Sequence, residues 1–135
     1  MKILRLIILI PAIIVVWLLA SILFPLFWGI FYPYETELDL FSFLFRSFFE
    51  ALFTTSAVVS SAKYIYPYKK KYPALIIVTI IHISMLMFFY FLGYYKYFYF
   101  TIKTIISLVE YTIGSVVMLG YFWKQTYADE IKSSK

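Results

Sequence analysis

Five ionisable side chains interrupt the long apolar stretches of this 135-residue chain. They are two bases, two acids and one imidazole: Arg46, Glu50, His82, Lys103 and Glu110. At membrane depth, such groups carry protons or cations, bind charged ligands, or pair with one another and fix the register of helices. An ionised side chain at the centre of a spanning helix costs roughly 2.5–3.5 kcal/mol. We therefore expect the five groups to face one another rather than lipid.

The spacing of these residues suggests which helices bring them together. Arg46 and Glu50 are four residues apart and share one face of a helix, and Lys103 falls at nearly the depth of Arg46 when residues are counted from the outer ends. Small residues near these charges would let two helices approach closely, as membrane helices prefer. These are Ala57, Ser60, Ser61, Gly114 and Ser115. We predict that segments 40–62 and 98–123 lie side by side.

The composition indicates an integral membrane protein. Hydrophobic residues make up 64% of the chain and charged residues 14%, whereas a soluble domain carries roughly 25% charged residues. Four apolar segments are each long enough to cross a hydrocarbon core of about 30 Å: 6–31, 40–62, 74–94 and 98–123. The sequence predicts an all-α protein with four transmembrane helices in an antiparallel up-down bundle. Residues 1–135 form one domain, with a polar tail at 124–135 that is expected to fray.

The basic residues predict the orientation. Most lie at segment ends that an up-down bundle places on one side, and only Lys96 lies on the other: Lys2, Arg5, Lys63, Lys69, Lys70, Lys71, Lys124, Lys132 and Lys135. Because basic residues are retained in the cytoplasm, we expect both termini and the 63–73 loop there, in a cell membrane.

The run Lys69, Lys70 and Lys71 is expected to set this topology. The alternative is that it binds anionic lipid headgroups of the bilayer. The net charge of +5 is not arranged as a stripe that would follow a phosphate backbone, so we expect no nucleic-acid partner.

His82 is the only histidine, and the chain has no cysteine. A haem or metal centre at His82 would need partner ligands, and the chain has no second histidine, so we expect no cofactor and no metal. A hydrogen-bonded packing role for His82 is the simpler interpretation.

Two classes of function remain. Because the sequence has no nucleophile beside a base and no glycine-rich phosphate loop, we expect no enzyme. The leading hypothesis is a non-catalytic multi-pass membrane protein, an accessory or assembly subunit or an envelope or immunity-type protein, that acts through helix–helix contacts in a homo-oligomer or larger membrane complex. The alternative is a homo-oligomeric small transporter or channel for protons, cations or small solutes, using Glu50 and Glu110.

Overall fold

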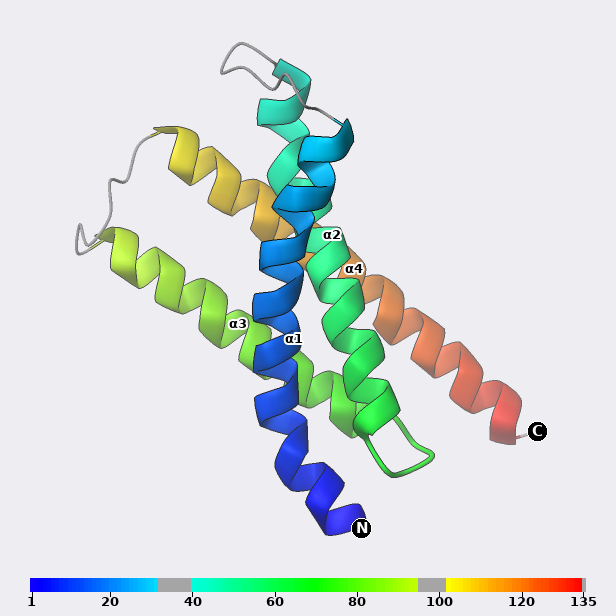
Figure 1. Ribbon diagram of the computed structural model, residues 1–135. Helices are drawn as coiled ribbons and strands as arrows, with labels where there is room; N and C mark the ends of the chain where they lie inside the picture. Colours follow the sequence, from blue (N-terminus) through cyan, green and yellow to red (C-terminus); the bar gives the residue numbers. More distant parts are fainter. Residues whose placement is uncertain (32–39, 95–101, 135) are drawn as a thin grey trace.

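A computed structural model describes residues 1–31, 40–94 and 102–134, with side chains described for 1–30, 45–92 and 105–132. Within these ranges the chain forms four helices and no strand (Figure 1). The helices are α1 (Lys2–Phe31), α2 (Leu40–Ile65), α3 (Tyr72–Tyr94) and α4 (Ile102–Ser134). The all-helical fold expected from the sequence is confirmed.

Three of the helices contain a stretch that is long and apolar enough to cross a membrane. These stretches are Lys2–Ile30, Tyr72–Leu92 and Ile105–Lys132. The helix α2 is not among them: its described part carries Arg46 and Glu50 together with several serines and threonines. Helix length and composition therefore support membrane association through α1, α3 and α4.

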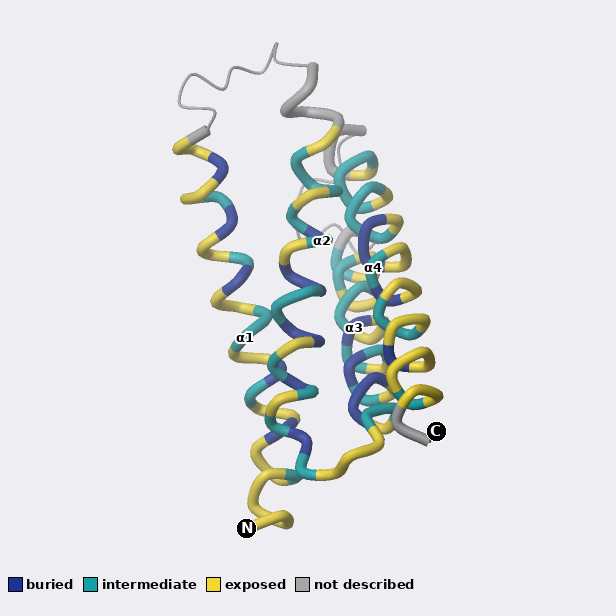
Figure 2. The backbone as a smooth tube through the Cα atoms, turned by 90° about the vertical axis from the view of Figure 1, so that its right-hand side faces the viewer, coloured by how far each residue is buried: buried dark blue, intermediate teal, exposed yellow. Residues whose placement is uncertain are grey.

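Successive helices run in opposite directions (Figure 1). The N-terminus, the turn at 66–71 and the C-terminal end of α4 lie toward the same end of the bundle, which we call the terminal end (Figures 1 and 2). The last turn of α1 and the first turn of α2 lie at the opposite end. The up-down path puts the N-terminal halves of α2 and α4 near one another.

The helix α2 is the centre of the bundle. It packs against all three other helices, most extensively against α4 and next against α1. The predicted pairing of the second and fourth helices is confirmed. α1 lies at one side and exposes a continuous apolar flank from Ile3 to Ile30 (Figure 2). Its prolines, Pro11 and Pro25, lie within one uninterrupted helix, as spanning helices tolerate.

The apolar core gathers toward the terminal end. All four helices contribute residues that are almost fully buried: Leu9, Ile13, Val58, Val59, Ala74, Leu75, Val78 and Leu119. Most are branched aliphatic side chains, which fill the space between helices at high density. The core therefore holds the helices together on the side of the bundle away from Arg46.

The polar segment 124–135 differs from its prediction. Instead of fraying after residue 123, α4 continues as a helix to Ser134. The backbone N–H of Lys71 donates a hydrogen bond to Glu130 Oε1 at 3.0 Å, and Thr126 is 2% exposed. Contacts with the start of α3, which the local composition does not reveal, keep this end of α4 in place.

Candidate functional site

A cavity of about 400 Å³ lies among the four helices. Each helix supplies a polar or aromatic side chain to its wall: Trp17 from α1, Glu50 from α2, Phe89 from α3 and Tyr111 from α4. Its volume falls within the range of roughly 300–1,000 Å³ that is usual for ligand pockets. One chain is thus enough to form a pocket lined by all four helices.

Helical periodicity explains why these side chains converge. Trp17 and Ser21 on α1 are four residues apart, Ser47 and Glu50 on α2 are three apart, and both spacings place side chains on one helix face. On α4 the same holds for Ser107 and Tyr111. The three serines add hydroxyl groups to a wall that is otherwise apolar and aromatic. Among the described residues that line the cavity, Glu50 is the only charged one.

The aromatic side of the cavity is held by contacts between helices. The rings of Trp17 and Phe89 lie 5.9 Å apart between centroids, at an interplanar angle of 32°. This separation falls within the range in which aromatic rings attract one another. The contact connects α1 to α3 beside the cavity, so the peripheral helix α1 forms part of the site.

A group of polar atoms lies in the wall around Tyr111. Its hydroxyl lies beside the hydroxyl of Thr54 and the indole N–H of Trp17. All three atoms are buried, and they make no hydrogen bond of regular geometry in the described part of the chain. Leaving such groups unpaired costs roughly 1–3 kcal/mol each. A small movement of these side chains would change both the contacts among the three polar atoms and the shape of the cavity.

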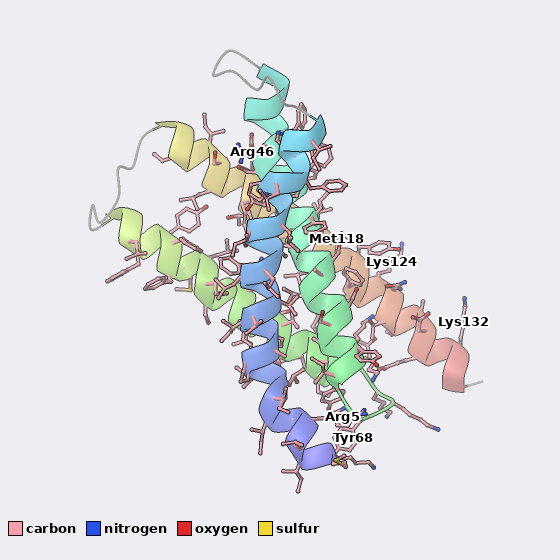
Figure 3. All side chains as sticks on the ribbon, viewed as in Figure 1. Arg5, Arg46, Tyr68, Met118, Lys124 and Lys132 are labelled. Atoms are coloured by element: carbon pink, nitrogen blue, oxygen red, sulfur yellow. The ribbon has the colours of Figure 1, made fainter. Side chains whose placement is uncertain are left out.

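Arg46 and Glu50 interact electrostatically along α2. They lie one turn apart, and the guanidinium favours the ionised carboxylate. Figure 3 places Arg46 in the half of the bundle away from Arg5 and Tyr68, which lie at the terminal end. Arg46 does not line the cavity. The side chain of Lys103, predicted at the same depth, lies outside the described side chains.

Glu110 lies between Leu108 and Tyr111 in the sequence, and both of these line the cavity, but Glu110 itself does not. Its Oε2 atom is buried and has no hydrogen-bond partner among the described residues. The structure therefore separates the two acids that the sequence treats alike. Glu50 reaches the cavity and Glu110 does not.

His82 is 3% exposed and has a defined partner. Its Nε2 lies 2.8 Å from the hydroxyl of Ser115 on α4. The imidazole also stacks on the ring of Tyr111, with centroids 6.1 Å apart and an interplanar angle of 5°. These contacts give His82 the hydrogen-bonded packing role that the sequence favours, and they tie α3 to the cavity wall.

Gly114 makes its closest contacts with α2 at Phe48 and Ala51, and not at the small residues of α2 that the sequence suggested. Gly114 lies against Phe48 and Ala51 of α2, since a Cβ on Gly114 would be 2.8 Å from the Phe48 carbonyl oxygen and 2.9 Å from Ala51 Cβ. Ser115 is buried, whereas Ala57 and Ser61 are half-buried and Ser60 is exposed. Crossing helices approach closely over only a short length. The contact made by Gly114 is therefore earlier on α2 than Ala57.

The basic residues at the turn 66–71 divide into two groups. Lys69 and Lys70 are exposed. The ammonium of Lys71 instead donates to the Tyr66 carbonyl oxygen at 2.8 Å. Binding of lipid headgroups by Lys69, Lys70 and Lys71 stays a prediction, and the first two are the more accessible.

Sequence reasoning missed most of the cavity wall. It named no residue of α1 as a site residue, yet Trp17 and Ser21 line the cavity. The available signal was the repeated spacing of three or four residues between polar or aromatic residues, as in the pair Ser107 and Tyr111. Which of these pairs face one another depends on how the helices pack.

Comparisons with known proteins give no relative for this chain. No family of known proteins, no curated protein and no solved structure matches it. Its function must therefore be inferred from the geometry described above.

Proposed function

We propose that the protein crosses a cell membrane four times, with α2 as the fourth span and both termini and the 63–73 loop in the cytoplasm. Three observations support this topology. The N-terminus, the 66–71 turn and the end of α4 lie toward one end of the bundle, as Figure 2 shows. That end carries Lys2, Arg5, Lys69 and Lys70, the kind of residues retained on the cytoplasmic side. The position of α2 between α1 and α4 supports its crossing.

We further propose that the protein is a non-catalytic membrane protein that binds a small ligand between its helices, as a small transporter or channel would. The observation that supports this is the cavity of about 400 Å³, to which every helix contributes and in which one carboxylate projects from an apolar wall. Ligand sites in helix bundles have this form: a mostly apolar pocket with a few placed polar groups. A carboxylate at membrane depth costs free energy, which favours a functional use.

The cavity can be tested with a neutral probe and a local reporter. The three tryptophans, Trp17, Trp28 and Trp123, can be labelled as 5-fluorotryptophan and assigned by single Trp→Phe variants. With the protein in dodecyl maltoside micelles, toluene should shift the ¹⁹F resonance of Trp17 saturably and leave that of Trp123 in place. The substitution Ser107→Phe should fill the cavity and remove the response.

A matched control is Ser60→Phe, which adds the same ring at an exposed position of α2. It should leave the Trp17 response unchanged. If toluene shifts all three resonances together, it dissolves in the micelle rather than binding in the cavity, and the proposal fails. The absence of any Trp17 shift would also contradict it.

A second candidate is the accessory or assembly subunit that acts through helix–helix contacts. The observation that favours it is the peripheral position of α1, whose apolar flank from Ile3 to Ile30 is exposed along the helix. Lipid also covers such a face, so a test is needed that separates lipid from a protein partner. The test compares the sizes of the unlabelled protein and its variants on a native gel in mild detergent. Under this hypothesis, Leu19→Trp on the flank should dissociate a larger complex, whereas Ser107→Phe inside the cavity should not.

A further inference from the structure

Resting on the proposed binding function, we propose that the cavity selects small organic monocations with an aromatic or compact apolar body, and that Glu50 is the residue that selects the charge. The proposal deepens the function above by naming the class of ligand. Three features of the cavity support it.

The first feature is the charge of the lining. Of the described side chains that line the cavity, Glu50 alone carries a formal charge. Its natural cation, Arg46, lies one turn away on the same helix and does not line the cavity. A carboxylate that reaches an apolar space is complementary to a single positive charge on a ligand, and the low dielectric strengthens this attraction.

The second feature is the aromatic wall. Trp17, Phe89 and Tyr111 come from three helices and line the same space. The negative face of an aromatic ring attracts an ammonium group, more strongly when water is excluded. The same rings provide contact area for the apolar body of a ligand. An anion would meet neither a cation nor favourable ring faces in this wall.

The third feature is the placement of hydroxyl groups near the acid. Ser47 lies one turn from Glu50 on α2, and Ser107 lies on the facing helix α4. Hydroxyl groups accept hydrogen bonds from an ammonium N–H and also tolerate an ammonium without protons, since they can donate to one another. The polar groups therefore lie on the α2 and α4 sides of the cavity, while Leu86 and Phe89 supply an apolar wall from α3.

Arg46 would compete with a bound cation for the carboxylate of Glu50, and this competition can be tested. A bound ammonium must share Glu50 with the Arg46 guanidinium, which attracts the same carboxylate. Removing that guanidinium should leave Glu50 more available to the ligand. Arg46→Gln should therefore bind a cation as tightly as the natural chain or more tightly, whereas Glu50→Gln should bind it more weakly.

The experiment uses phenyltrimethylammonium, whose charge does not depend on pH, and its neutral isostere tert-butylbenzene. Binding is measured on the full chain in dodecyl maltoside micelles by the ¹⁹F resonance of 5-fluorotryptophan at position 17. Glu50→Gln should weaken phenyltrimethylammonium binding at least tenfold and leave tert-butylbenzene binding within about twofold. Retained binding of the neutral probe shows that the variant keeps its cavity.

The matched control is Glu110→Gln, which removes the same charge from a neighbouring helix position outside the cavity wall. It should leave binding of both probes unchanged. Equal weakening by Glu50→Gln and Glu110→Gln, or no effect of Glu50→Gln, would overturn the proposal. If tert-butylbenzene binds to the natural chain and phenyltrimethylammonium does not, the cavity takes neutral ligands or lipid tails, and the cation proposal fails while the binding function stands. If neither probe shifts Trp17, both fail.

Discussion

The carboxylate of Glu130 accepts a hydrogen bond from the backbone N–H of Lys71 at 3.0 Å, across 59 residues of sequence. Lys71 immediately precedes α3, where the first N–H groups of a helix lack partners within the helix. A negative charge at this end is also favoured by the helix dipole. The end of α4 therefore caps α3 and fastens the terminal end of the bundle.

The first prediction concerns this cap. Glu130→Ala should lower the free energy of unfolding by about 1 kcal/mol, the usual effect of losing a capping side chain. SDS titration of the protein in dodecyl maltoside, followed by circular dichroism, measures the change. Asp129→Ala removes an equal charge at the adjacent, exposed position and should have a smaller effect. Equal losses for the two variants would mean that net charge, rather than the cap, is responsible.

The second prediction compares two glycines of α4. Gly114→Ala should destabilise the protein by about 1–3 kcal/mol, because the added methyl would overlap the Phe48 carbonyl oxygen and Ala51, and backbone atoms do not move aside cheaply. Gly120→Ala meets nothing within 4 Å. It should be neutral or stabilising by up to about 1 kcal/mol, since alanine is the better helix former. The SDS unfolding midpoint should therefore fall for Gly114→Ala and stay unchanged or rise for Gly120→Ala. A neutral Gly114→Ala would contradict the close approach of α2 and α4.

The third prediction concerns the bond between His82 and Ser115. A double-mutant cycle with His82→Phe and Ser115→Ala should give a coupling energy of about 0.6 kcal/mol, within a range extending to about 1.7. The pair is buried, whereas the contact between the hydroxyls of Tyr90 and Thr112, 3.1 Å apart on the same two helices, is exposed. The cycle of Tyr90→Phe with Thr112→Val should give a smaller coupling. Additive effects at His82 and Ser115 would show that their contact does not stabilise the fold.

The fourth prediction concerns topology. Because the chain has no native cysteine, single cysteines report on one site each. Thr36→Cys and Tyr95→Cys should react with an impermeant maleimide added to intact cells, whereas Lys70→Cys should react only after the cells are opened. Labelling of Lys70→Cys in intact cells, without labelling of Thr36→Cys, would mean that the orientation is the reverse of the proposed one. If Thr36 and Lys70 variants were both labelled from outside, α2 would not span the membrane.

The sequence by itself determined the helical, membrane-associated character of the protein and the pairing of its second and fourth helices. Long apolar stretches can satisfy their backbone groups in lipid only as helices or closed barrels, so composition restricts the secondary structure strongly. The helix ends were less well determined. α4 extends well past residue 123 because Glu130 and Thr126 are held against the rest of the bundle, and local polarity does not show such contacts.

Only the tertiary structure decided which polar groups share a site. Glu50 and Glu110 both interrupt apolar stretches of the sequence, but the rotation of their helices takes Glu50 into the cavity and leaves Glu110 outside it. The contact of Gly114 with Ala51 rather than Ala57 depends on where two crossing helices approach most closely. Both outcomes arise from how side chains of different helices fit together, and the periodicity of one helix does not contain that information.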